Sequence, residues 1–198
     1  MMSLRAFIQF IVYTLTPVLV CVRGFYLYES IPRQDFRTYA FNIGESAWII
    51  FLILVFIRVI NDLLVTTTLL GNLLEKILSY ERELLVFFTW LIFFHVLFIA
   101  LTIKNFAAAF DSITNLQSAW SWGFLASLTA FFIGITSNNF SQRLLKTYWE
   151  RTRFLFYGTF IFGVIHMAII KNSYTYFLIV VGMFIVLKAS ALWRTFRS

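Results

Sequence analysis

The chain has 198 residues, of which 61% are apolar, 20% aromatic and only 13% charged. A soluble domain is typically nearer half apolar and a quarter charged, so this composition excludes an ordinary water-soluble domain and predicts an all-α integral membrane protein. The net charge of +7 does not indicate a nucleic-acid partner, because the basic residues are spread between apolar segments. A single cysteine, Cys21, excludes an internal disulfide and a cysteine-ligated metal cluster.

Six uncharged apolar stretches follow one another and predict a six-transmembrane-helix bundle that forms a single domain over residues 1–198. They run from Ala6 to Val22, from Ser46 to Ile57, from Leu84 to Ile103, from Gln117 to Gln142, from Phe154 to Ile170 and from Asn172 to Leu187. The second stretch is short because Arg58 interrupts it, and it reaches spanning length only if the helix begins near Phe41.

The segments around these stretches add three expectations. The first stretch has no small residues before Cys21 that would form a cleavage site, so we expect a retained helix, kinked at Pro17. The linker from Asn61 to Glu83 is amphipathic and is expected at the membrane interface. A very tight connection is expected around Lys171 to Ser173, between the last two helices.

The distribution of Lys and Arg predicts the orientation, because cytoplasmic loops carry an excess of positive charge. One predicted side collects eleven basic residues: Arg5, Arg58, Lys76, Arg82, Arg143, Lys146, Arg151, Arg153, Lys188, Arg194 and Arg197. The other side collects five: Arg23, Arg33, Arg37, Lys104 and Lys171. The sequence therefore predicts both termini in the cytoplasm.

His95 and His166 are the two histidines of the chain, and both lie within apolar stretches. An ionisable residue inside a membrane is costly, so each is a candidate functional residue, the alternative being a ring that only bonds to a neighbouring helix. His95 follows Arg82 by thirteen residues, and His166 follows Arg153 by thirteen. At 1.5 Å per residue both rings are expected about 20 Å from the cytoplasmic basic residues, at one level on parallel helices.

Two imidazoles at one level on neighbouring helices can bind one flat macrocycle from opposite faces. No other histidine, cysteine pair or carboxylate cluster falls at that depth, which disfavours a zinc site or a carboxylate-bridged metal site. Haem iron accepts such axial ligands, and its apolar ring suits the interior of a helical bundle. The sequence therefore predicts His95 and His166 as the axial ligands of one haem.

Three blocks of sequence resemble the haem-binding membrane subunit of the bacterial periplasmic methionine-sulfoxide reductase system, within the ferric-reductase-like transmembrane family. The blocks run from Thr136 and Ser137 through Gln142, Arg143, Leu145 and Trp149 to Tyr157 and His166, from Arg82 through Leu84 and Leu85 to His95, and from Gly44 to Trp48. The resemblance covers nearly the whole chain and implies haem ligation at the positions of His95 and His166.

The resemblance also implies an activity. Electrons from the quinone pool or from a flavin such as FMN would reach a b-type haem and pass to a periplasmic molybdopterin enzyme on the outer face of a bacterial inner membrane. The chain would be an electron-transfer subunit of an oxidoreductase rather than a complete enzyme. The family has a further histidine shortly after the position of Trp149, where this chain has Arg153, so we expect one haem and not two.

Four other residues are candidates for the edge of the haem or for a quinone. Glu45 can accept a quinol proton or contact the haem edge, although a carboxylate at the membrane interface needs no such role. Arg37, Lys104 and Lys171 lie on the predicted outer side, where they can pair with haem propionates or anchor helix ends to lipid. A group of cytoplasmic arginines can hold a flavin phosphate, although orienting the chain explains them equally well; these are Arg58, Arg82, Arg143, Arg151 and Arg153.

Two other functions remain open. The chain can be the membrane part of a ferric or oxygen reductase, in which case a separate dehydrogenase subunit is needed. It can also be a structural membrane subunit, with or without haem, of a larger respiratory or photosynthetic complex. Haem content separates the redox functions from a haem-free scaffold.

Overall fold

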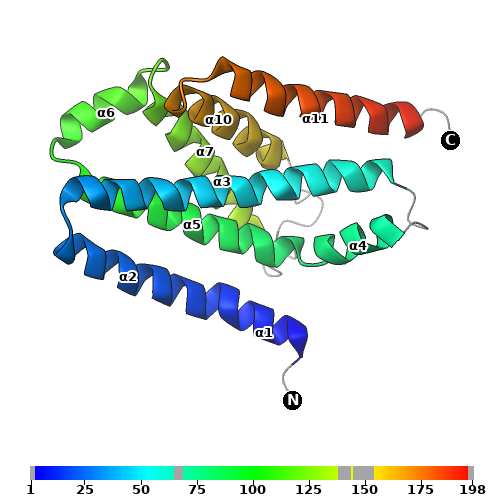
Figure 1. Ribbon diagram of the computed structural model, residues 1–198, viewed down its shortest axis with the longest axis horizontal. Coiled ribbons are helices and arrows are strands. Elements are labelled where there is room, and N and C mark those ends of the chain that lie inside the picture. Colours follow the sequence, from blue (N-terminus) through cyan, green and yellow to red (C-terminus); the bar gives the residue numbers. More distant parts are fainter. Residues whose placement is uncertain (1–2, 65–68, 138–143, 145–153, 196–198) are drawn as a thin grey trace.

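Figure 1 shows the computed structural model, which describes residues 3–64, 69–137, 144 and 154–195. Within these residues the chain is helical and contains no strand. The elements are α1 (Leu4–Phe10), η1 (Ile11–Leu15), α2 (Thr16–Ser30), α3 (Arg33–Leu63), α4 (Leu69–Leu78), α5 (Glu81–Thr102), α6 (Phe106–Thr114), α7 (Ala119–Thr136), α10 (Phe154–Ile170) and α11 (Tyr174–Thr195).

Five helices are long and apolar enough to cross a membrane: Leu4–Ser30, Arg33–Leu63, Glu81–Thr102, Ala119–Thr136 and Tyr174–Arg194. The chain is therefore a multi-pass helical membrane protein in contact with lipid. α10 is also apolar, but its 17 described residues are one fewer than the 18 of the shortest of these five helices. Residues 145–153, which precede it, lie outside the described residues. Its bounds are those expected from the sequence.

Several helices are longer than the apolar pattern predicts. The first continues to Ser30, beyond the expected end at Val22, and the second begins at Arg33 rather than near Phe41. The last continues to Thr195, beyond the expected end at Leu187. These helices can include charged residues near their ends, because side chains there reach water or an ionic partner. Arg58 does not interrupt the second helix, because its guanidinium donates to Glu81 on α5 at 2.9 Å.

The first spanning helix changes its winding before Pro17. The π-helical turn η1 separates α1 from α2, and Pro17 occupies the first turn of α2. A proline removes one backbone donor from the helix, and a local change of winding re-satisfies the freed carbonyls. The expected distortion at Pro17 is thus present as a wider helical turn on its N-terminal side.

Short connections position the other helices. The link between α10 and α11 is a Schellman turn, in which Asn172 adopts φ 45° and Ser173 N–H donates to Ala168 C=O at 3.0 Å. α4 forms within the linker expected to be amphipathic, with Gly71 and Leu74 buried and Leu69 exposed. It follows α3 and packs against it.

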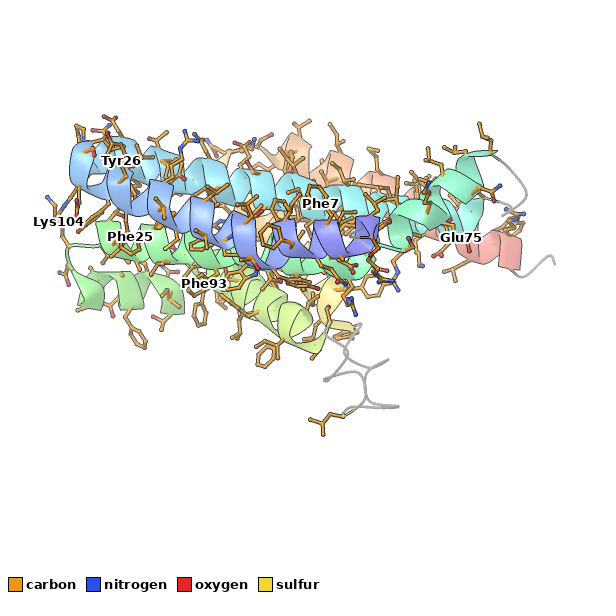
Figure 2. All side chains as sticks on the ribbon, turned by 90° about the horizontal axis from the view of Figure 1, so that it is seen from below. Phe7, Phe25, Tyr26, Glu75, Phe93 and Lys104 are labelled. Carbon is orange, nitrogen blue, oxygen red and sulfur yellow. The ribbon has the colours of Figure 1, made fainter. Side chains whose placement is uncertain are left out.

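The helices alternate in direction along the horizontal axis of Figure 1, so the bundle has two distinct ends. We call the right-hand end, where α3 and α11 finish, the terminal end, because α11 is the last helix of the chain and the first helix also begins in the right-hand half. The opposite end, where α2 meets α3 and α10 meets α11, is the far end. Figure 2 labels Glu75 near the terminal end and Lys104 at the far end, with the exposed rings of Phe7, Phe25 and Phe93 between them.

Four helices form a ring that defines the interior. α3 packs mainly on α5, α7 packs mainly on α10, and α5 also contacts α7. The backbones of α3 and α10 lie farther apart, and aromatic side chains fill the space between them. The order around the ring is therefore α3, α5, α7 and α10, which places α5 and α10 diagonally opposite each other. α11 covers the side between α3 and α10 and contacts both.

Aromatic side chains fill the interior in the terminal half of the ring. The ring of Phe51 on α3 lies 4.8 Å from that of Phe88 on α5 and 4.8 Å from that of Phe156 on α10. Phe51 and Phe88 are almost fully buried. The two histidines lie on the far side of this packed layer.

Candidate functional site

His95 extends from α5 onto the backbone of α3. Its Nδ1 donates a hydrogen bond to the carbonyl of Ala40 at 2.8 Å. A Cβ placed on Gly44 would lie 2.5 Å from the same Nδ1 atom, closer than real side chains approach. Gly44 therefore lets the imidazole lie directly against the backbone of α3. It lies one helical turn after Ala40, whose carbonyl accepts the hydrogen bond.

His166 makes the equivalent contact on the other half of the ring. It extends from α10 onto α7, where Nδ1 donates to the carbonyl of Ala119 at 2.7 Å. A Cβ on Gly123 would lie 2.6 Å from Cε1 of His166. Each histidine thus contacts an alanine carbonyl and the glycine four residues later. These pairs are Ala40 with Gly44 and Ala119 with Gly123.

The hydrogen bonds decide which ring nitrogen is available. A carbonyl oxygen can only accept, so Nδ1 of each neutral imidazole carries the proton and Nε2 keeps its lone pair. Within the described residues neither Nε2 makes a hydrogen bond, and neither is sealed inside the protein. The two histidines come from α5 and α10, which lie diagonally across the ring of helices. Each therefore keeps one imidazole nitrogen that could bind a ligand.

Two aromatic side chains of α3 lie near the helices that carry the histidines. The ring of Phe41 lies 6.3 Å from that of His95. Trp48 is buried beside α10, where a Cβ on Gly163 would lie 2.3 Å from the indole. Trp48 Nε1 also donates to the hydroxyl of Tyr176 at 2.5 Å, which ties α11 to α3. Aromatic residues of α3 thus contact both His95 and the helix of His166.

The four secondary candidates fall in different places. Glu45 and Lys171 form an ion pair of 2.6 Å, with about half of each side chain exposed. This hydrogen bond to Glu45 raises the pKa of Lys171. Arg37 lies over the ring of Phe41 at 5.5 Å, whereas Lys104 lies beyond the end of α5 and is exposed. Of these four, Arg37 is connected to His95 through an aromatic contact.

The arginines considered for a flavin phosphate have ionic partners where the structure describes them. Arg58 pairs with Glu81 and lies 5.6 Å above the ring of Phe156. Arg82 NH2 donates to Glu83 at 3.1 Å. Arg143, Arg151 and Arg153 lie outside the described residues, as does Trp149.

Sequence reasoning missed a buried carboxylate near the terminal end. The side chain of Glu83 is 1% exposed, and its Oε1 accepts from Arg5, Gln9 and Arg82 at 3.0–3.1 Å. Glu83 thereby attaches the first helix, which buries very little of its surface, to α5. The adjacent Arg82 and Glu83 in the sequence were the only signal for this ion pair. No neighbouring residue in the sequence indicated that Arg5 and Gln9 would also bind Glu83.

A metal site of the usual kind is not present among the residues that the structure describes, since no three His, Cys, Asp or Glu side chains converge there. His95 and His166 each keep one nitrogen that could bind a metal carried by a cofactor. Metal-binding histidines commonly donate the other ring N–H to a backbone carbonyl, as both histidines do here. The glycines supply the space that the rings need against the neighbouring helices.

Comparisons with known proteins add no family. No family model, curated protein or solved structure matches the chain. The site must therefore be interpreted from its own residues.

Proposed function

We propose that the chain is a transmembrane b-type cytochrome subunit that binds one haem between His95 and His166. When bound, the haem supplies one-electron chemistry at its iron. From the sequence resemblance we take the electron donor to be quinol or a flavin. We take the acceptor to be an outer-face redox partner, such as a molybdopterin sulfoxide reductase. The chain is then a subunit of an oxidoreductase, not a complete enzyme.

One observation carries this proposal: both histidines keep Nε2 free while Nδ1 is bound to a backbone carbonyl. A neutral imidazole bound at Nδ1 keeps its lone pair on Nε2, and a lone pair is what binds a metal. α5 and α10 lie diagonally across the ring, so the two histidines come from opposite sides of it. Such a pair would hold one haem between the two helices.

The protein's own residues orient and tune this site. The carbonyls of Ala40 and Ala119 fix the tautomer and the rotation of each imidazole, and a hydrogen bond at Nδ1 raises the basicity of the ligand. The ring of Phe41 beside His95 and the buried indole of Trp48 against α10 would make the surroundings of a bound haem apolar, which is a further control on its redox potential.

The terminal half of the ring supports a single haem. Phe51, Phe88 and Phe156 pack together there, and Arg58 lies over Phe156 paired with Glu81. An interior filled in this way supports the expectation, drawn from Arg153, that a second haem is absent.

We further propose six membrane spans, with α10 as the fifth, and both termini in the cytoplasm of a bacterial inner membrane. The alternation of helix direction and the eleven-to-five distribution of basic residues support this orientation. The far end then faces the outside, and the histidines lie nearer that face.

The test is a dithionite-reduced minus oxidised visible spectrum of the detergent-purified chain, recorded after haem supply, beside His95→Ala and His166→Ala. A b-type signal in the parent that is lost in either variant is the expected result. Added imidazole should restore part of the signal in each variant, because it can occupy the space left by the ring. Absence of haem from a folded parent would rule out the proposal and favour a structural membrane subunit.

A further inference from the structure

Arg37 lies at the far end of a row of α3 residues that leads to the histidine site. The row consists of Arg37, Phe41, Gly44 and Trp48, spaced by four, three and four residues. Side chains at such spacings share one helix face. Gly44 receives the ring of His95 and Trp48 is buried beside α10, so this face borders the proposed site.

The contacts connect Arg37 to that site. The guanidinium carbon of Arg37 lies 5.5 Å from the centre of the Phe41 ring, within the range of a cation–π interaction. The Phe41 ring lies 6.3 Å from His95. The ring of Phe41 thus links the guanidinium of Arg37 to the side chain of His95, on the far-end side of that histidine.

Arg37 also has unused hydrogen-bonding capacity. Among the described residues it makes no hydrogen bond or ion pair, so its five N–H donors are available. Lys171, by contrast, already binds Glu45 at 2.6 Å. Arg37 and Lys104 are both exposed, but among the described residues Lys104 has no aromatic contact that links it to a histidine.

We propose that Arg37 binds a carboxylate on the far edge of the ligand held by His95 and His166. The site would then select a flat apolar macrocycle whose carboxylates face the far end, as haem propionates can. A guanidinium suits this role because its planar donors bind a carboxylate in a bidentate manner. The inference rests on the proposed function and specifies which edge of the ligand is recognised.

The test compares two ligands that differ only at the carboxylates. The apo chain in detergent is titrated with hemin and with the dimethyl ester of hemin, in the parent, in Arg37→Gln and in Lys104→Gln. Arg37→Gln should weaken hemin binding by about tenfold, the size expected for one charge-assisted hydrogen bond, and should scarcely change binding of the ester. Lys104→Gln, which removes an exposed cation at the same end, should leave both affinities unchanged.

The possible failures are distinct. If Arg37→Gln weakened the binding of hemin and of its ester equally, Arg37 would stabilise the fold and not bind the carboxylate. An unchanged affinity for hemin would also overturn the inference. If the parent binds neither ligand, the proposed function fails and this inference fails with it.

Discussion

Gly44 and His95 occupy a single contact between α3 and α5, since a Cβ on Gly44 would lie 2.5 Å from Nδ1 of His95. Gly123 and His166 repeat this relationship between α7 and α10. In both cases the glycine follows, by four residues, the alanine whose carbonyl accepts the imidazole proton. The two histidines are therefore held by equivalent backbone contacts on opposite sides of the ring.

The first prediction is that Gly44→Ala and Gly123→Ala each displace an imidazole. The added methyl group cannot be accommodated without moving the ring, so bound haem should be reduced and the remaining spectrum should lose its six-coordinate character. Overpacking of this kind typically costs about 1–3 kcal/mol of stability. Visible spectra and haem content, measured at equal protein concentration, check the result.

Gly158→Ala is the matched control for these variants. Gly158 lies on α10, as His166 does, but the nearest atom to its added Cβ is at 3.6 Å, an ordinary contact distance. Gly182 has nothing within 4 Å and provides a second control on α11. If Gly158→Ala lost as much haem as Gly123→Ala, the contact at His166 would not be the cause.

The second prediction concerns the attachment of the first helix. Glu83→Ala leaves three donors, from Arg5, Gln9 and Arg82, without their shared acceptor. We expect a loss of about 1–3 kcal/mol and faster proteolysis within the first helix, because that helix buries little other surface. Arg5→Ala should have a smaller effect, since its side chain is 54% exposed. Unchanged thermal unfolding and proteolysis in Glu83→Ala would show that packing alone holds the helix.

Hydropathy predicted much of the helical fold, because long apolar stretches are a local signal in the sequence. The same local signal selected His95 and His166 as candidate ligands, and that assignment stays a prediction. The partners of the histidines could not be predicted, since only tertiary packing decides that α5 faces Ala40 and that α10 faces Ala119. Glu83 was missed for the same reason: its donors Arg5 and Gln9 are more than seventy residues away.

The third prediction is a small dependence of stability on alkaline pH. The hydrogen bond to Glu45 raises the pKa of Lys171 above the value near 10.4 expected in the unfolded chain. The stabilisation is therefore fully present below that unfolded value and is lost as the pH rises through the higher folded value. Because both side chains are about half exposed, the effect should stay below about 1 kcal/mol. Thermal unfolding at pH 8 and at increasing pH above 10 in the parent and in Glu45→Gln measures it, and the difference should decrease as the pH rises through the folded pKa of Lys171.

The fourth prediction concerns the attachment of α11. Trp48→Phe and Tyr176→Phe each remove the hydrogen bond between Trp48 Nε1 and the Tyr176 hydroxyl. Each should lower stability by about 0.5–1.5 kcal/mol, and the double variant should cost less than the sum because both changes delete the same bond. Thermal unfolding of the two single variants and the double variant supplies the coupling energy. Strict additivity would mean that the bond contributes nothing.

The fifth prediction tests the six spans and their orientation. Lys104 and Glu75 lie toward opposite ends of the bundle (Figure 2), so single cysteines at these positions should react from opposite sides of the membrane. In a Cys21→Ser background, a membrane-impermeant maleimide applied to intact cells should label Lys104→Cys. It should label Glu75→Cys only after the membrane is permeabilised, because the excess of basic residues predicts that the terminal end is cytoplasmic. Labelling of both positions in intact cells would contradict the alternation of helices on which the shared level of the two histidines depends. The reverse pattern would preserve the bundle but place the site nearer the cytoplasm, where a periplasmic electron acceptor could not reach it.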